Sequence, residues 1–247
     1  MKYEVILFDA DETLFDFHRS ERHAFAQTMR SFGFEYDEVH HLQAYQAINA
    51  AIWKEFEEGR ITQQVLKVER FCRYAAHIHA SFDPTDFAHA YEGNLGNACF
   101  LLAGSAEVIG ELYGKHRMAI ITNGLKRVQE MRIAKSPIAS YFEAIVISEA
   151  VGVSKPDPAI FNLTLAQLHH ADRKTTLMVG DSLTSDILGG IRAGLDTCWY
   201  NPAGLPGRSD IRPTHEIRTL SELLPLLDAP FIFEKNKQTL DGTWIRQ

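Results

Sequence analysis

Three acidic side chains follow a short apolar run close to the start of the chain. The run at 5–8 reads VILF, and Asp9, Ala10, Asp11 and Glu12 come directly after it. An aspartate is ionised and nucleophilic at neutral pH, and a second carboxyl group can carry a proton to or from the reacting atoms. Like charges this close repel each other unless a cation lies among them. Asp9 and Asp11 are therefore candidates for catalysis at a metal site, although a polar turn after a buried strand would look the same.

Polar side chains also follow three of the later apolar runs. They are Thr122 and Asn123 after 118–122, Lys155 in the loop after 145–148, and Asp181 after 177–180, with Asp186 one helical turn further on. Taken singly, each cluster could be a turn or a helix cap. The carboxyl ends of parallel strands, however, share one edge of a sheet, and ligands bind at that edge. The joint occurrence of polar groups at successive strand ends therefore favours one shared site.

The residue types of this predicted site suit a phosphoryl group and a hard cation. Its acids are Asp9, Asp11, Asp181 and Asp186. Carboxylate oxygens with room for water favour Mg²⁺ over zinc. Lys155 adds a positive charge, while Thr122 and nearby backbone amides offer hydrogen bonds to an anion. We therefore expect Mg²⁺ as cofactor and a phosphorylated substrate.

Five runs rich in β-branched and aliphatic residues predict the strands that position these groups. They lie at 5–8, 118–122, 145–148, 177–180 and 197–200. Helix-length segments separate the later runs, and the runs themselves are continuously apolar, which is typical of parallel strands covered on both faces. The fold class predicted is therefore α/β, with a Rossmann-like parallel sheet as the core.

Residues 16–98 show no strand pattern and instead place apolar residues at helical spacing in at least four stretches. In the third stretch the apolar residues that share a face are Val65, Val68, Phe71, Cys72 and Ala75. Such stripes indicate the packed core of a helical bundle. An all-helical insert after the first strand follows from this pattern.

Composition restricts the possible partners. The 247 residues carry a formal charge of −7, which provides no electrostatic footprint for a nucleic acid polymer or an anionic membrane. The three cysteines are widely spaced and indicate neither a disulfide framework nor a thiolate metal site. No signal peptide and no membrane-spanning run is apparent, so we expect a cytoplasmic protein. The oligomeric state is not indicated.

The ordered polar motifs resemble those of the haloacid dehalogenase-like hydrolase superfamily. They are DADET at 9–13, TNG at 122–124, Lys155, and GDSLTSD at 180–186. The resemblance implies a core domain made of 1–15 and 99–228, with a four-helix cap inserted at 16–98. It leaves 229–247 as a C-terminal extension of undefined structure.

The resemblance also implies a role for each core residue. Asp9 attacks the phosphate and forms an aspartyl-phosphate, and Asp11 acts first as general acid and then as general base. Thr122 and Asn123 hold the phosphoryl oxygens, and Lys155 offsets negative charge on the nucleophile and on the transferred group.

The same resemblance implies how Mg²⁺ is bound. Its ligands are the carboxylate of Asp9, the backbone carbonyl of Asp11 and the carboxylate of Asp181, and Asp186 supports this metal site or Lys155.

Segments within the helical insert resemble the pyrimidine 5′-nucleotidases that act on non-standard nucleoside monophosphates. These segments are YQAINAAIW at 45–53, GRIT at 59–62 and ERF at 69–71. The implied function is Mg²⁺-dependent hydrolysis of a phosphomonoester, with a nucleoside monophosphate as substrate. Asn49, Trp53 and Arg70 are candidates to face the nucleoside, because an amide, an indole and a guanidinium can bind or stack on a base. Ordinary packing within the cap would explain the same residues equally well.

Several alternatives share part of this pattern. A sugar-phosphate phosphatase or phosphomutase of the same superfamily would keep the core residues and differ in the cap. A 2-haloacid dehalogenase uses an aspartate nucleophile but needs neither Mg²⁺ nor a second acid, so Asp11 argues against it. A non-enzymatic phospho-receiver module is phosphorylated on an aspartate that normally ends a middle strand, with an acid pair earlier, in a domain about half this size. The order of the motifs here differs, and the chain carries an insert.

Overall fold

The computed structural model describes residues 2–228, apart from the side chain of Glu57. Six strands form one sheet in the order β3-β2-β1-β4-β5-β6, and all of its pairings are parallel. The strands are β1 (Val5–Phe8), β2 (Arg117–Thr122), β3 (Ala144–Ile147), β4 (Thr176–Gly180), β5 (Asp196–Tyr200) and β6 (His215–Ile217). The predicted α/β fold with a parallel sheet is confirmed. The sixth strand was not predicted, because three residues reading HEI carry too little apolar pattern.

The register of the central strands places the acidic motif. Phe8, the last residue of β1, lies opposite Ile120 of β2 and Val179 of β4. The amide of Asp9 then donates to the carbonyl oxygen of Val179 over 2.9 Å. Asp9 therefore emerges between the carboxyl ends of the two neighbouring strands, where the polar residues following β2 and β4 also begin.

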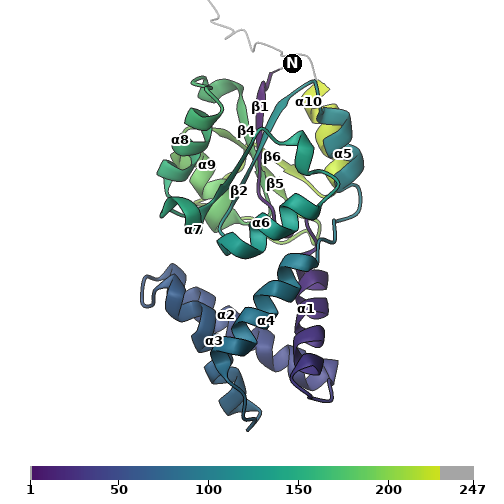
Figure 1. The fold of residues 1–247 in the computed structure, drawn as a ribbon. Coiled ribbons are helices and arrows are strands. Elements are labelled where there is room, and N and C mark those ends of the chain that lie inside the picture. The colour runs from purple at the N-terminus through teal and green to yellow at the C-terminus, as the bar shows by residue number, and fades with distance from the viewer. Residues whose placement is uncertain (1, 229–247) are drawn as a thin grey trace, which may run out of the picture.

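Helices cover both faces of the sheet, as the apolar strands require. On one face, α5 (Ser105–Leu112), α6 (Lys126–Lys135) and α10 (Leu223–Asp228) bury a core against alternate residues of β1, β2 and β4. On the other face, α8 (Pro158–Gln167) and the segment following α9 (Leu188–Arg192) bury the remaining residues of these strands. Figure 1 shows these two groups of helices on opposite sides of the sheet.

The α9 helix lies close to its neighbours because its second and third residues are glycines. A Cβ atom at Gly189 would come within 2.6 Å of the Phe161 ring of α8, and one at Gly190 within 2.6 Å of the Thr197 side chain of β5. The absence of side chains at these two positions therefore permits the close packing of α9 on the sheet.

A helical insert follows β1 and packs around its own hydrophobic core. Its helices are α1 (Phe17–Ser31), α2 (Gln43–Glu57), α3 (Gln63–His77) and α4 (Pro84–Asn97), with the short η1 (Glu38–Leu42) before α2. Aromatic rings dominate this core: Phe25 stacks on Tyr45 with centroids 4.4 Å apart, and Tyr45 stacks on Phe71 at 5.5 Å. The inserted helical bundle is confirmed as part of the fold class, while its boundaries at 16–98 stay a prediction.

The predicted buried face of α3 was partly wrong. Val65 is 45 % exposed, whereas its neighbour Leu66 is fully buried together with Arg70, Phe71 and Tyr74. The helix is therefore rotated so that a charged residue, Arg70, faces inward. Apolar periodicity alone could not predict this, because it assigns arginine to the solvent face.

The helical insert lies beyond the carboxyl ends of the strands, on the side where β1 ends (Figure 1). The last turn of α4 packs against α6 of the core, where a Cβ atom at Gly96 would lie 3.0 Å from the Met131 side chain. No helix within residues 2–228 is both long and apolar enough to span a bilayer. The predicted extension at 229–247 lies outside the described residues.

Candidate active site

Asp9 and Lys155 form a buried ion pair at the carboxyl edge of the sheet. Asp9 Oδ1 lies 2.5 Å from Lys155 Nζ, and the lysine side chain is 1 % exposed. Nζ also donates to the carbonyl oxygen of Ile121 over 2.8 Å and lies 2.7 Å from Asp186 Oδ1. Burial opposes the charged form of Lys155, but the carboxylates of Asp186 and Asp9 outweigh it and raise its pKa above the ordinary value. Lys155 is therefore a fixed cation beside Asp9.

The side chain of Asn123 holds the backbone of Lys155. Asn123 Oδ1 accepts from the Lys155 amide, and Nδ2 donates to the Lys155 carbonyl oxygen, both over 2.9 Å. Both polar ends of this amide group are thus used within the protein. Its side chain therefore sets the position of the lysine loop, while the expected contact of Asn123 with the phosphoryl oxygens stays a prediction.

Three carboxylates lie close enough to share a metal ion. Oxygens of Asp9, Asp181 and Asp186 lie within 4.8 Å of one another. The pKa of Asp9 is raised to about 7, mainly because the group is buried. The charges of Asp186 and Asp11 raise this pKa further, whereas the charge of Lys155 lowers it. Burial and the charge of Asp9 raise the pKa of Asp181 to about 8. A carboxylate cluster that resists ionisation without a cation fits a hard divalent ion such as Mg²⁺.

Asp186 is better placed to hold the residues around this cluster in position than to be its main metal ligand. It is 1 % exposed, its Oδ2 accepts from the Ser182 amide over 3.0 Å, and its Oδ1 faces Lys155. A Cβ atom at Gly180 would lie 2.3 Å from Asp186 Oδ2, so glycine is required where β4 ends. Asp186 therefore anchors both Lys155 and the turn that carries Asp181.

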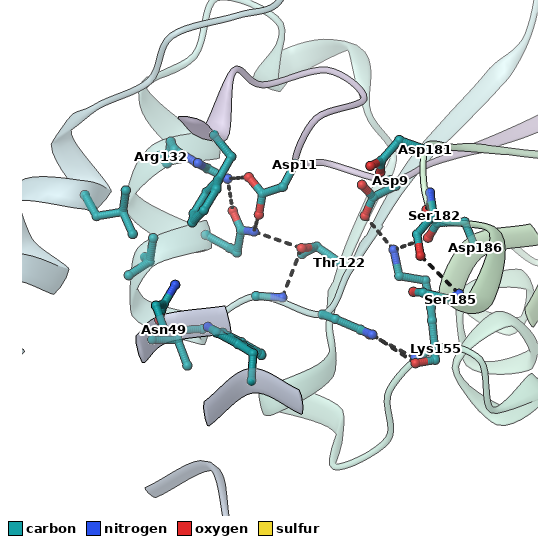
Figure 2. A pocket seen from close by; sticks show the side chains of 18 of the residues that line it. Asp9, Asp11, Asn49, Thr122, Arg132, Lys155, Asp181, Ser182, Ser185 and Asp186 are labelled. Carbon is teal, nitrogen blue, oxygen red and sulfur yellow. Dashed lines mark hydrogen bonds and ion pairs between the residues drawn. The ribbon is translucent and has the colours of Figure 1, made fainter. Parts of the chain in front are cut away.

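Asp11 is held by two residues of α6 that the sequence analysis did not identify. Arg132 Nη2 contacts Asp11 Oδ1, and Gln129 Nε2 donates to Asp11 Oδ2 over 2.7 Å. The Arg132 side chain is fully buried, and its guanidinium carbon lies 5.0 Å from the centre of the Phe15 ring. Figure 2 shows the Asp11 carboxylate turned toward Arg132 and away from Asp9. The signal available in the sequence was the spacing of Gln129 and Arg132, two polar residues three positions apart on the helix that follows the Thr122 motif.

This geometry separates Asp11 from the carboxylate cluster. Its predicted role as a metal ligand depended on the backbone carbonyl, and that role stays a prediction. Both oxygens of its side chain contact α6, so the carboxyl group must turn away from Arg132 before it can reach a substrate. Its role as general acid and base likewise stays a prediction.

Thr122 has a hydroxyl group suited to an anion. Its Oγ1 accepts from the Gly124 amide over 3.1 Å and from Gln129 Nε2 over 2.8 Å. With the acceptor positions used, the hydroxyl proton is left to donate into the cavity. Thr13, a second hydroxyl, lies 3.4 Å from Asp9 Oδ2 and 3.5 Å from Asp181 Oδ1.

A cavity of about 320 Å³ lies between these core residues and the helical insert. On the core side it is lined by Asp9, Asp11, Thr122, Asn123, Arg132, Lys155, Asp181 and Asp186, among others. On the insert side it is lined by Phe17, Asn49, Trp53, Arg70 and Leu95, which we call the roof. The structure therefore brings every predicted site residue to one cavity, and Asn49 lies across it from Asp9 (Figure 2).

Sequence comparisons match this chain over most of its length. Residues 6–200 match the family model described as haloacid dehalogenase-like hydrolase. The chain is 37 % identical over 230 residues to pyrimidine 5′-nucleotidase YjjG of Escherichia coli, covering 92 % of this chain and 99 % of that protein. It is 35 % identical over 233 residues to pyrimidine 5′-nucleotidase PynA of Streptococcus pneumoniae, covering 92 % and 96 %.

Solved structures share the fold. The magnesium-bound crystal structure of the putative HAD-hydrolase YfnB from Bacillus subtilis superposes with a TM-score of 0.86 at 33 % identity, covering 93 % of this chain and 100 % of that one. The L-2-haloacid dehalogenase of Xanthobacter autotrophicus superposes with a TM-score of 0.71 at 18 % identity, covering 91 % and 98 %. The second likeness concerns the fold alone.

Proposed function

Because the chain belongs to the haloacid dehalogenase-like hydrolases, we propose that it is a Mg²⁺-dependent phosphomonoesterase that acts through an aspartyl-phosphate on pyrimidine nucleoside monophosphates, non-standard ones included. Its membership of the family and its resemblance to pyrimidine 5′-nucleotidases, both predicted from the motifs, are confirmed by the matches. The prediction that it is an enzyme is confirmed with them.

The observation that carries the proposal is the position of Asp9. One of its oxygens is held by Lys155 at 2.5 Å, it belongs to the carboxylate cluster, and it lines the cavity. Lys155 keeps the carboxylate oriented and offsets the charge of an approaching phosphate. Asp9 is thus oriented as a nucleophile at the base of a cavity large enough for a small phosphorylated ligand.

The reaction follows in two displacements. An Asp9 oxygen attacks phosphorus, the ester P–O bond breaks, and the leaving alkoxide takes a proton from Asp11. Water then attacks the phosphorus of the aspartyl-phosphate, Asp11 accepts a proton from that water, and the bond between phosphorus and Asp9 breaks. The products are the alcohol, inorganic phosphate and the enzyme in its starting state.

Other residues of the chain position the transferred group. The Thr122 hydroxyl and the ammonium of Lys155 hold its oxygens, so that developing charge meets fixed donors. Asp9, Asp181 and the Asp11 carbonyl would hold Mg²⁺, which supplies charge neutralisation for the phosphoryl oxygens. Asp186 keeps Lys155 in place through the contact at 2.7 Å.

The roof supports the choice of a nucleoside as leaving group. Trp53 and Phe17 offer flat apolar surfaces to the cavity, and Asn49 and Arg70 offer polar groups. The relatives named as pyrimidine 5′-nucleotidases extend over this same helical insert. The proposal includes a small phosphorylated metabolite as the partner and a cytoplasmic location.

Release of inorganic phosphate from a panel of nucleoside monophosphates and sugar phosphates tests the proposal. Turnover of pyrimidine monophosphates with Mg²⁺, abolished by EDTA, is the expected result. Turnover restricted to sugar phosphates would refute the nucleotidase proposal and favour the alternative phosphatase or phosphomutase, which shares the core residues.

A further inference from the structure

A second cavity lies beside the one that Asp9 lines, which we call the catalytic cavity. The second cavity encloses about 210 Å³, and we call it the side cavity. Four residues line both cavities, namely Trp53, Asn123, Lys155 and Ser185. The ammonium of Lys155 lies 2.5 Å from Asp9, so the side cavity begins within one lysine side chain of the nucleophile. The reaction above does not use this space.

The side cavity offers no free charge to a ligand. Lys155 is the one charged residue among the described residues that line it. Its Nζ lies 2.5 Å from Asp9 and 2.7 Å from Asp186, so its charge already serves the reacting centre. A second anionic group in the side cavity would lack a counter-charge. The occupant that suits this cavity is therefore neutral.

Two aromatic rings of α2 contribute to the lining. Trp53 and Phe56 are three residues apart and so share one side of the helix, with ring centroids 5.8 Å apart and ring planes at 83° to each other. Trp53 lines both cavities, whereas Phe56 lines the side cavity alone. A planar ligand can lie flat on one ring with its edge toward the other. These two rings therefore suit a flat ring.

Hydroxyl groups supply the polar part of the lining. They belong to Ser154, Thr184 and Ser185, and none of the three hydroxyls has a hydrogen-bond partner among residues 2–228. A hydroxyl can donate one hydrogen bond and also accept. Carbonyl or N–H groups at the edge of a flat ring can therefore be bound here.

We propose that the side cavity binds the base of the leaving nucleoside, with the ring against Trp53 and Phe56 and its polar edge toward the three hydroxyl groups. This inference rests on the proposed function and deepens it by naming where the base binds. The sugar then spans the distance between the phosphate at Asp9 and the base. A simple sugar phosphate would leave the side cavity without a ligand, so the contacts made there would favour nucleotides.

Replacing Phe56 by alanine tests the aromatic contact, because this ring lines the side cavity and not the catalytic cavity. We expect kcat/KM for uridine 5′-monophosphate to fall about fivefold in Phe56→Ala, the loss of one ring contact of about 1 kcal/mol. The inhibition constant of inorganic phosphate, which binds at the core alone, should stay within about twofold of wild type. A fall in kcat/KM below about twofold would overturn the inference.

Phe82→Ala is a matched control in the same helical insert. Phe82 stacks on Phe87 with ring centroids 4.4 Å apart, and it lines neither cavity. We expect a lower melting temperature and a kcat/KM for uridine 5′-monophosphate within about twofold of wild type. An equal fall in kcat/KM for Phe82→Ala and Phe56→Ala would show a general effect on the insert and overturn the role of Phe56.

A crystal structure of Asp9→Asn with uridine 5′-monophosphate and Mg²⁺ locates the base directly. We expect the phosphate beside Thr122 and Lys155, and the base beside Phe56 and the hydroxyl groups of the side cavity. The catalytic cavity offers another apolar surface, lined by Phe17, Leu95, Leu125 and Val128. A base bound against that surface would overturn the inference.

These experiments distinguish a failure of the side cavity from a failure of the proposed function. If the wild-type enzyme hydrolyses sugar phosphates but no pyrimidine monophosphate, the nucleotidase proposal fails, and the side cavity has no base to bind. If uridine 5′-monophosphate is hydrolysed but Phe56→Ala leaves kcat/KM unchanged, the nucleotidase proposal stands and only the assignment of the side cavity is overturned.

Discussion

The two walls of the cavity are built on different principles. On the core side, charged groups are joined by short contacts, 2.5 Å from Lys155 to Asp9 and 2.7 Å from Lys155 to Asp186. On the roof side, Glu21, Asn49 and Arg70 are joined by longer hydrogen bonds of 3.3 and 3.2 Å between three helices. The core residues lie at or beyond strand ends whose register is set by the backbone, whereas the roof residues depend on how side chains pack between helices. The reaction can therefore be preserved while recognition of the leaving group changes.

The largest effect is expected at the core wall. Asp9→Asn keeps the shape of the side chain but removes its negative charge and nucleophilicity, so kcat should fall by about 10⁴-fold or more. Phosphate release measures the loss, and a thermal melt checks that the variant is folded. Residual activity above about 1 % of wild type would exclude Asp9 as the nucleophile.

Removal of the metal should affect the core wall next most strongly. EDTA is expected to lower turnover by about 10³-fold or more, and added Mg²⁺ should restore it. Adding Ca²⁺ in place of Mg²⁺ provides a control, because Ca²⁺ prefers more ligands and a looser geometry than Mg²⁺. Full activity in EDTA would contradict a metal-dependent reaction.

The strength of Mg²⁺ binding should depend on pH. In the metal-free protein the pKa values of Asp9 and Asp181 are raised to about 7 and about 8, so both carboxyls take up protons as the pH falls through this range. Protons then compete with the metal, and the apparent Kd for Mg²⁺ should decrease by about tenfold or more from about pH 6 to pH 8. Isothermal titration calorimetry in two buffers measures the affinity and the proton release. An affinity independent of pH would show that these carboxyls are ionised before the metal binds.

Arg132 tests whether the position of Asp11 matters as much as its presence. Arg132→Met keeps a long apolar side chain but removes the contact with Asp11, so we expect kcat to fall by about 10-fold to 100-fold and the pH profile of kcat to shift. Arg132→Lys should recover part of the loss. A fall in stability with an unchanged pH profile would indicate a purely structural residue.

The smallest effect is expected at the roof. Trp53→Ala removes a flat apolar surface, and KM for a pyrimidine monophosphate should rise about fivefold, which corresponds to about 1 kcal/mol. The value of kcat should change far less, because Trp53 lies on the wall opposite the reacting atoms. A larger effect on kcat than on KM would show that the two walls are not independent.

Many of the core site residues could be predicted from the sequence, but their partners could not. Asp9, Thr122, Lys155 and Asp181 follow apolar strands or lie in the loop beyond one, and this local pattern is readable along the chain. Asn123 was expected to hold phosphoryl oxygens, which stays a prediction, and the sequence did not reveal that its side chain holds the Lys155 backbone. A polar residue in a turn looks the same in the sequence whether it faces a ligand or a loop.

The sequence by itself determined the parallel sheet and the residues at its carboxyl edge. The physical reason is that continuously apolar strands joined by helices must run parallel, so the residues following them must meet. Only the tertiary structure decided that Arg132 holds Asp11, that Arg70 faces inward on α3, and that Glu21 accepts a hydrogen bond from Asn49. These contacts join helices far apart in sequence, and hydrogen-bond direction depends on which groups face each other after packing. Local periodicity carries no information about that.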